Sequence, residues 1–198
     1  MAKHRYAWEA RANRHTASAA PLAQWDEADL YDWIQDHSSP LILVLDGVQD
    51  PHNLGASLRT ADAAGVHAVL VPRKATAPIS ETVRRIACGG AERVPVVTAA
   101  NLARALNRLR ELGLRLVGTA DQAGETLYAT NLCGPLVLVM GSEGKGLSRV
   151  TRNCCDELVS IPMFGATPCL NLSVAVGVCL FEAVRQRQRG KKNGPPNG

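Results

Sequence analysis

The stretch LILVLDGVQDPHNLGASLRTADAAG, residues 41–65, decides the fold class of this chain. It opens with a continuous apolar run rather than an alternation, which predicts a strand buried on both faces of a sheet. Asn53 is a favoured N-cap residue, and the residues after it predict a helix that ends at Gly65. A buried strand followed directly by a helix is typical of α/β proteins.

The same alternation continues along the chain. We expect further strands at residues 68–72, 114–119, 135–141 and 157–162, and further helices at residues 26–35, 80–88, 101–112, 147–155 and 171–187. Strands that alternate with helices predict an α/β fold with a mostly parallel sheet flanked by helices. The 198 residues suit one domain of ordinary size, with residues 1–40 as an N-terminal arm or linker and residues 189–198 as a disordered basic tail.

Composition narrows the possible partners. The net charge is only +4, but basic residues gather near both ends, at residues 3–14 and 185–192. Basic ends around a neutral domain fit a polyanion as partner. Solvated flexible ends explain the same pattern, so charge alone leaves both explanations open.

The six cysteines show no C-x-x-C spacing, which predicts free thiols rather than a zinc site or a disulfide framework. No signal peptide or long apolar segment is recognisable, so we expect a soluble cytoplasmic protein without metal or membrane contact.

Three polar blocks follow predicted strands. They read NLGASLR (residues 53–59), GSEGKG (141–146) and IPMFGATPCLN (161–171). Ligands bind at the carboxyl ends of strands in open α/β sheets, so three such loops predict one composite site. The second block is neither a phosphate-binding P-loop, which needs Ser or Thr after the Gly-Lys pair, nor an early G-x-G-x-x-G dinucleotide fingerprint.

Together these blocks resemble the TrmH-type ribose 2′-O-methyltransferases of the SPOUT superfamily, over residues 41–188. Residues 46–69 and 155–163 are most similar to the subfamily that methylates a guanosine in large-subunit ribosomal RNA. The resemblance implies that residues 41–188 form a methyltransferase catalytic domain with a deep C-terminal trefoil knot. It also implies S-adenosyl-L-methionine as cofactor and a homodimer with a site built across its interface, to which the apolar face of the last helix is suited.

Carried onto matching positions, the resemblance implies a cofactor cleft lined largely by backbone groups. Its residues are Gly141, Ile161 and Leu170, joined by Thr119 and Met163. For Ile161 and Leu170 the alternative is ordinary core packing. Glycines in the second block allow the close approach that such a cleft needs.

The resemblance further implies four polar catalytic residues, Asn53, Arg59, Glu143 and Asn171. Each has a plainer alternative: Asn53 and Asn171 can cap helices, Glu143 can pair with Lys145, and Arg59 can be a solvated helix arginine. The apolar neighbours of Arg59 predict a largely buried helix, and because an unpaired buried arginine is rare, they disfavour that last alternative.

The implied reaction is attack of a ribose 2′-hydroxyl on the sulfonium methyl carbon. In the resembling family the arginine that matches Arg59 is proposed as the general base. A guanidinium has a pKa above about 12, so a cation there is better suited to stabilising a developing alkoxide or gripping a phosphate. We therefore expect Arg59, Cys169 and Lys145 to contact the RNA substrate.

Two departures from the family pattern keep alternatives open. Cys169 stands where the family usually has Ser, and a thiol is the weaker hydrogen-bond donor. The resembling ribosomal subfamily also carries a separate N-terminal RNA-binding domain, for which residues 1–40 leave no room. The given sequence is therefore either a catalytic-domain fragment or a chain that finds its RNA through its basic ends and a partner protein. A transfer RNA ribose methyltransferase, or a non-catalytic RNA-binding or ribosome-assembly factor on the same fold, therefore remains an alternative to a ribosomal RNA enzyme.

Overall fold

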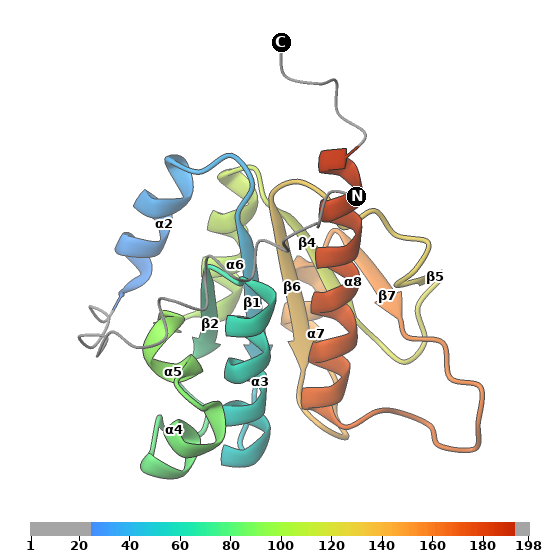
Figure 1. The fold of residues 1–198 in the computed structure, drawn as a ribbon, viewed down its shortest axis with the longest axis horizontal. Coiled ribbons are helices and arrows are strands. Elements are labelled where there is room, and N and C mark those ends of the chain that lie inside the picture. Colours follow the sequence, from blue (N-terminus) through green and yellow to red (C-terminus); the bar gives the residue numbers. More distant parts are fainter. Residues whose placement is uncertain (1–24, 193–198) are drawn as a thin grey trace, which may run out of the picture.

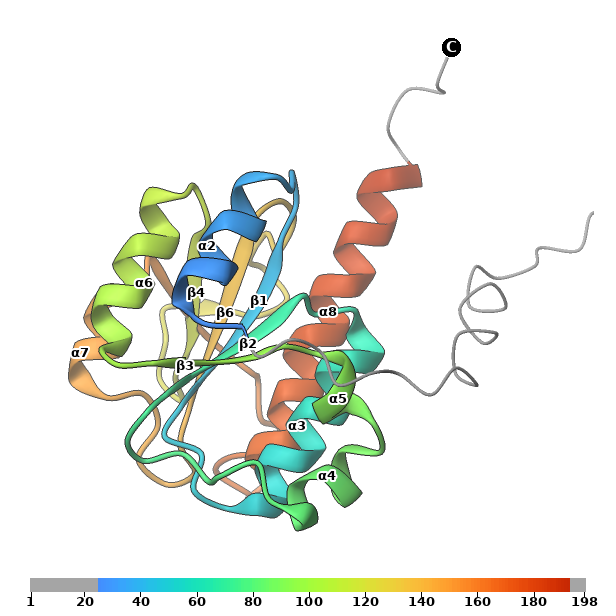
Figure 2. The same ribbon diagram turned by 90° about the vertical axis from the view of Figure 1, so that its left-hand side faces the viewer.

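In the computed structural model, residues 25–192 are described, and they form three layers. A central sheet is covered on one face by α3, α4, α5 and α8 and on the other by α2, α6 and α7 (Figures 1 and 2). The elements in chain order are α2 (Glu27–Gln35), β1 (Leu41–Asp46), α3 (Pro51–Ala64), β2 (Ala68–Pro72), α4 (Glu81–Ala87), α5 (Gly90–Arg93), β3 (Val96–Ala99), α6 (Leu102–Glu111), β4 (Arg115–Thr119), β5 (Glu125–Thr126), β6 (Leu136–Gly141), α7 (Arg149–Cys154), β7 (Glu157–Ser160) and α8 (Leu172–Lys192).

The described strands form one sheet in the order β3-β2-β1-β6-β4-β7-β5, and each of its pairings is parallel. The predicted α/β fold with a parallel sheet flanked by helices is therefore confirmed. Two late strands, β6 and β7, lie between strands that precede them in the chain. This order is compatible with a threaded C-terminal segment, and the trefoil knot itself stays a prediction.

The strand predicted from residues 41–46 is confirmed as β1, whose apolar residues Leu41–Leu45 are buried. It lies between β2 and β6, so both of its edges are paired, and helices cover both of its faces. The helix predictions at residues 26–35, 80–88, 101–112 and 147–155 are confirmed to within two residues at each end. The short elements β3, β5 and α5 were not predicted.

The N-cap of α3 differs from the prediction. Asp50, not Asn53, caps the helix by accepting a hydrogen bond from the backbone N–H of His52 at 2.8 Å. Pro51 occupies the first turn, where its missing N–H costs nothing. Gly65 ends the helix in the left-handed conformation, with φ of 71°, as predicted. Asn53 thus lies inside the first turn, where its side chain is free for another task.

The basic C-terminal run is partly structural, because some of its charges bind other parts of the chain. The guanidinium of Arg187 donates to the carbonyl oxygens of Ser39, Pro40, Leu132 and Gly134. Burial lowers the pKa of Arg187 from its ordinary value.

The rest of this run is also partly ordered, and Arg185 pairs with Glu182 at 2.6 Å. α8 also extends to Lys192 rather than ending at Arg187. Residues 1–24 and 193–198 of the predicted arm and tail lie outside the described part.

Candidate functional site

The three polar blocks meet through a hydrogen-bond network among Asn53, Glu143 and Asn171. Nδ2 of Asn53 donates to Oε2 of Glu143 at 2.9 Å. Nδ2 of Asn171 donates both to Oδ1 of Asn53 at 2.9 Å and to Oε1 of Glu143 at 3.1 Å. Both oxygens of the carboxylate therefore accept an amide hydrogen, and the three blocks meet at one place, as the sequence predicted.

The fold places each member of this network from a different element. Asn53 is buried, at 6% exposure, in the first turn of α3, which follows β1. Glu143 is in the loop that leaves β6, the strand paired with β1. Asn171 precedes α8, and its Oδ1 accepts from the backbone N–H and the hydroxyl of Ser173 at 3.0 and 2.7 Å. Asn171 therefore both caps α8 and binds the other two residues.

A cleft of about 440 Å³ opens beside this network. That volume lies in the range of small-molecule sites. Loops after β1 and β6 form most of its wall, which is lined by Asp46, Gly47, Val48, Gln49, Asp50, Asn53, Ala75, Ser142, Glu143, Lys145, Gly146, Ser148 and Leu172. The cleft lining thus includes carboxylate and amide groups that can accept hydrogen bonds from hydroxyl groups.

Asp46 is a cleft residue that the sequence analysis did not predict. It ends β1, lines the cleft, and accepts a hydrogen bond from the backbone N–H of Ser148 at 2.9 Å. This bond ties the end of the second polar block to β1. A lone acid directly after the apolar run of residues 41–45 was the available signal, because a charge at the end of a buried strand needs a partner.

Gly141 is essential for the shape of the same loop. It is buried at the end of β6, beside Asp46 of β1. A Cβ atom on Gly141 would lie 2.1 Å from the carbonyl carbon of Gly146 and 2.2 Å from the nitrogen of Leu147. No side chain fits there, so the loop can fold back over its own strand only with glycine at this position.

The predicted cofactor residues lie along one edge of the sheet. Thr119, Gly141 and Ile161 follow or end the neighbouring strands β4, β6 and β7 at their carboxyl ends. Leu170 is half-buried just before α8, whereas Met163 is 37% exposed. Ile161 also packs against the core, so its plainer alternative holds as well. Of these five residues none lines the cleft described above.

This edge fits S-adenosylmethionine by the chemistry of its donors. Adjacent parallel strands end there, so their backbone N–H and C=O groups face the loops and can bind an adenine edge and an amino-acid group. Thr119 directs its hydroxyl toward the carbonyl oxygen of Val139 at 3.5 Å, inside the sheet.

Arg59 departs from the expectation. Its side chain is exposed, so the argument that a largely buried helix disfavours a solvated arginine was wrong. It follows Asn53 by six positions, which places it about 240° further around the helix. Within one chain, Arg59 therefore does not join the network of Asn53, Glu143 and Asn171.

Lys145 and Cys169, the other predicted substrate contacts, are both exposed. Lys145 lines the cleft, and Cys169 lies in the loop before α8. Glu143 binds the two amides, so the network, not the plainer pairing with Lys145, accounts for both of its oxygens.

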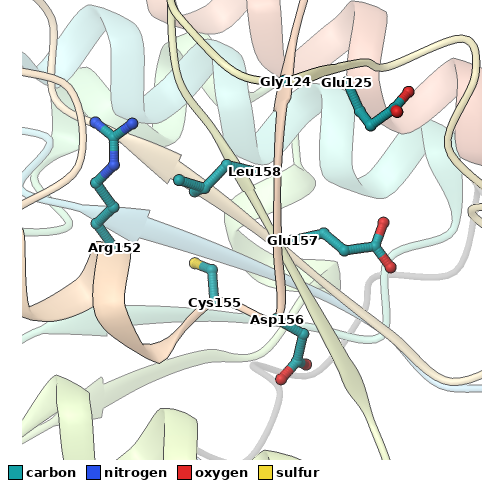
Figure 3. Close-up of a pocket in the computed structure, with 7 residues that line it drawn as sticks. All are labelled: Gly124, Glu125, Arg152, Cys155, Asp156, Glu157 and Leu158. Atoms are coloured by element: carbon teal, nitrogen blue, oxygen red, sulfur yellow. The ribbon is translucent and has the colours of Figure 1, made fainter.

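A second cavity, of about 400 Å³, lies between α7 and the strands β5 and β7 (Figure 3). Its lining includes Arg152, Cys155 and Glu157 but none of the predicted site residues. Within residues 25–192 no group of three or more His, Cys, Asp or Glu side chains is arranged to hold a metal ion. No helix of this same part has both the length and the apolar character that crossing a membrane requires.

Comparison with known proteins gives a family for this geometry. The model of the SpoU rRNA Methylase family matches residues 40–181. Among curated relatives, the 23S rRNA (guanosine-2′-O-)-methyltransferase RlmB of Photorhabdus laumondii is 56% identical over 171 residues, which cover 86% of this chain and 70% of that protein. RlmB of Escherichia coli strain K12 is 54% identical with the same coverage.

Solved structures agree with this assignment. The SpoU methyltransferase AviRb of Streptomyces viridochromogenes, in complex with AdoMet, matches with a TM-score of 0.74 and 32% identity, covering 80% of this chain and 65% of that chain. A TrmH/SpoU tRNA modifying enzyme of A. aeolicus matches with a TM-score of 0.70 and 28% identity, covering 83% of this chain and 86% of that chain. The resemblance drawn from the three blocks is confirmed, and the chain belongs to the SpoU rRNA methylase family.

Proposed function

We propose that this chain transfers a methyl group from S-adenosylmethionine to the ribose 2′-hydroxyl of a guanosine in large-subunit ribosomal RNA. The observation that carries the proposal is the Asn53–Glu143–Asn171 network, which joins the three polar blocks at one cleft. RlmB relatives, 54–56% identical to this chain, are named for this reaction.

Positioning is the main demand on the protein. S-adenosylmethionine supplies a methyl group already activated by a positively charged sulfur. The O–C bond forms as the S–C bond breaks, so the ribose oxygen must be aligned with the methyl carbon and sulfur. Glu143 keeps lone pairs free for a hydroxyl donor after accepting from Asn53 and Asn171, because a carboxylate has about four acceptor sites. It can therefore orient the 2′-hydroxyl toward the methyl group.

The proton of the 2′-hydroxyl must leave as the methyl group arrives. A guanidinium remains charged, so the role that suits Arg59 is to stabilise the negative charge that develops on the oxygen or to bind the adjacent phosphate. Because Arg59 is exposed and lies on another face of α3 than Asn53, it can serve this role in the site of a second copy.

A homodimer would supply that second copy. Val174 and Phe181 lie on the same face of α8, two helical turns apart, and their exposed fractions are 52% and 50%. α3 and α8 lie side by side, and the residue after Arg59, Thr60, approaches Gly177 of α8. An interface on this apolar face would carry Arg59 to its margin, as a site shared between protomers requires.

The reaction is tested by incubating the chain with tritiated S-adenosylmethionine and either ribosomal RNA lacking its own methylation or unmodified transfer RNA. We expect tritium in the ribosomal RNA, recovered as 2′-O-methylguanosine after nuclease digestion. Label in transfer RNA alone would instead support a transfer RNA enzyme. Binding of ribosomal RNA without any transfer would favour the non-catalytic RNA-binding factor.

Complementation tests the shared site. Arg59→Ala and Asn53→Ala should each inactivate the homodimer. If Arg59 acts on the partner's site, a heterodimer of the two variants contains one intact site, and an equal mixture recovers roughly a quarter of wild-type activity. If Arg59 acts within its own chain, the mixture stays inactive.

A further inference from the structure

Two basic residues at the rim of the cleft have no role in the site described so far. Arg73 and Lys74 form the turn directly after β2, and both side chains are exposed. Within residues 25–192 no hydrogen bond or ion pair engages either side chain. The next residue, Ala75, lines the cleft that contains Asn53 and Glu143. The two charges therefore directly precede a residue of the cleft wall, and no described side chain pairs with either.

The turn is held against the cleft by its backbone. The N–H of Arg73 donates to the carbonyl oxygen of Ala99 at 2.9 Å, and the N–H of Ala77 donates to that of Val48, a cleft residue, at 2.8 Å. The Thr76 hydroxyl donates to the carbonyl oxygen of Pro72 at 2.8 Å. These bonds fix both ends of a short segment, so the basic pair is presented at a defined position.

The turn also carries backbone strain. Ala75 has φ of 70°, in the left-handed region that non-glycine residues avoid. Strain of this kind persists only where the surroundings impose it, and it is concentrated at functional sites. Here it turns the chain so that Ala75 faces the cleft while Arg73 and Lys74 precede it on the rim.

Acidic and basic residues meet at this cleft. Its lining includes three carboxylates, Asp46, Asp50 and Glu143, which can accept hydrogen bonds from ribose hydroxyls but repel phosphate. The nearby bases are Lys145, which also lines the cleft, and Arg73 and Lys74, which precede the lining residue Ala75; these three are called the rim. A nucleotide whose ribose is bound by Glu143 would therefore have its phosphates best accommodated by the rim.

We propose that Arg73 and Lys74 bind the RNA phosphates that flank the target ribose, and so position it over the network of Asn53, Glu143 and Asn171. The inference rests on the proposed function, and it adds a second polyanion contact to Lys145. It assigns the RNA-binding charge to the cleft rim rather than to the basic ends of the chain alone.

The test compares Arg73→Gln/Lys74→Gln with Arg104→Gln/Arg108→Gln, a pair of exposed arginines on α6 that also removes two charges. RNA affinity is measured by filter binding from low to high salt with a ribosomal RNA transcript. For the rim variant we expect a Kd raised about tenfold near physiological salt and a log–log salt slope smaller by about 1.4, since each phosphate contact in a single strand contributes about 0.7. The α6 variant should match the wild type in both.

Two further measurements keep the result interpretable. Affinity for S-adenosylmethionine and the melting temperature should be unchanged in the rim variant, which excludes misfolding. Arg73→Lys should keep the wild-type salt slope, because it keeps the charge. Equal RNA affinity in the rim and α6 variants would overturn the inference. A wild-type chain that binds RNA through the rim but transfers no methyl group would instead overturn the proposed function and leave this inference standing.

Discussion

Nδ2 of Asn53 lies 2.9 Å from Oε2 of Glu143, although the two residues are 90 positions apart in the chain. The contact exists because β1 and β6 are neighbours in the sheet, so the helix after one strand and the loop after the other meet at the same edge. Asn171 closes the network from a third segment. The site is thus a product of the strand order.

Asn171→Ser separates the two tasks of Asn171. Serine is a good N-cap, so α8 should keep its start and the melting temperature should change little. The amide donor to Asn53 and Glu143 is lost, so methyl transfer should fall about 100-fold, as for removal of one positioned hydrogen bond at a reacting centre. Melting curves and initial rates measure both effects. Unchanged rates would mean that Asn171 only caps the helix.

Arg59→Lys should lose about 100-fold in methyl transfer while the fold is unaffected. A lysine keeps the charge but not the planar fork that binds a phosphate or alkoxide at two points. Because Arg59 is exposed, the melting temperature should stay that of the wild type. Arg104→Lys, also at an exposed helix position, is the matched control. Retention of most activity would show that two-point geometry is unimportant.

Gly141→Ala should disrupt the second polar block. Its Cβ would overlap the backbone of Gly146 and Leu147, and backbone cannot move aside as a flexible side chain can. We expect a loss of about 2 kcal/mol in unfolding free energy, in the usual range for overpacking, and weaker S-adenosylmethionine binding. Gly124→Ala, where a Cβ meets nothing within 4 Å, is the control and should be near neutral. Similar urea midpoints for the two variants would refute the crowding argument.

Arg187→Gln should destabilise the protein rather than weaken RNA binding. The guanidinium binds four carbonyl oxygens from two segments, and a shorter neutral amide leaves most of them unsatisfied. We expect a loss of about 3 kcal/mol in unfolding free energy. Arg189→Gln, exposed on the same helix, should have little effect on stability. A larger loss of stability in Arg189→Gln than in Arg187→Gln would show that Arg187 is a solvated residue of the basic C-terminal run.

Cysteine reactivity should follow burial. Burial raises the pKa of Cys179 from about 9 to about 12, so its thiol stays protonated where an exposed thiol ionises. Iodoacetamide at pH 8 should modify the exposed Cys88 and Cys169 and spare Cys179. Because the pKa of Cys179 is higher in the folded than in the unfolded state, its contribution to the free energy of unfolding is fully present below about pH 9. That contribution is lost as pH rises toward 12. Fast native labelling of Cys179 by mass spectrometry would contradict this.

Local sequence predicted the elements well and the caps less well. The apolar run at residues 41–45 predicted a strand buried on both faces, and β1 is one. Asn53 was read as an N-cap because Asn favours that position, yet Asp50 before Pro51 was the stronger signal. The error mattered, because it hid the reason that the amide of Asn53 is free to bind Glu143.

Burial and pairing across the sheet could not be predicted from the sequence. The neighbours of Arg59 are apolar, but they face the core while Arg59 itself points outward, since a helix has more than one face. Arg187 was read with the other bases of the C-terminal run, because nothing local shows that residues 39–40 and 132–134 approach it. Short elements such as β5 carry too few residues for a period to be visible.

The central claim is that Asn53 and Glu143 act as one unit in methyl transfer. The most direct test is a double-mutant cycle on the single-turnover rate of ribose methylation, with Asn53→Ala, Glu143→Gln and both together. We predict that each single change costs about 100-fold and that the double variant is little slower than either, because the second change removes a contact already lost. Losses that multiply in the double variant, or single variants that keep wild-type rates, would contradict the account.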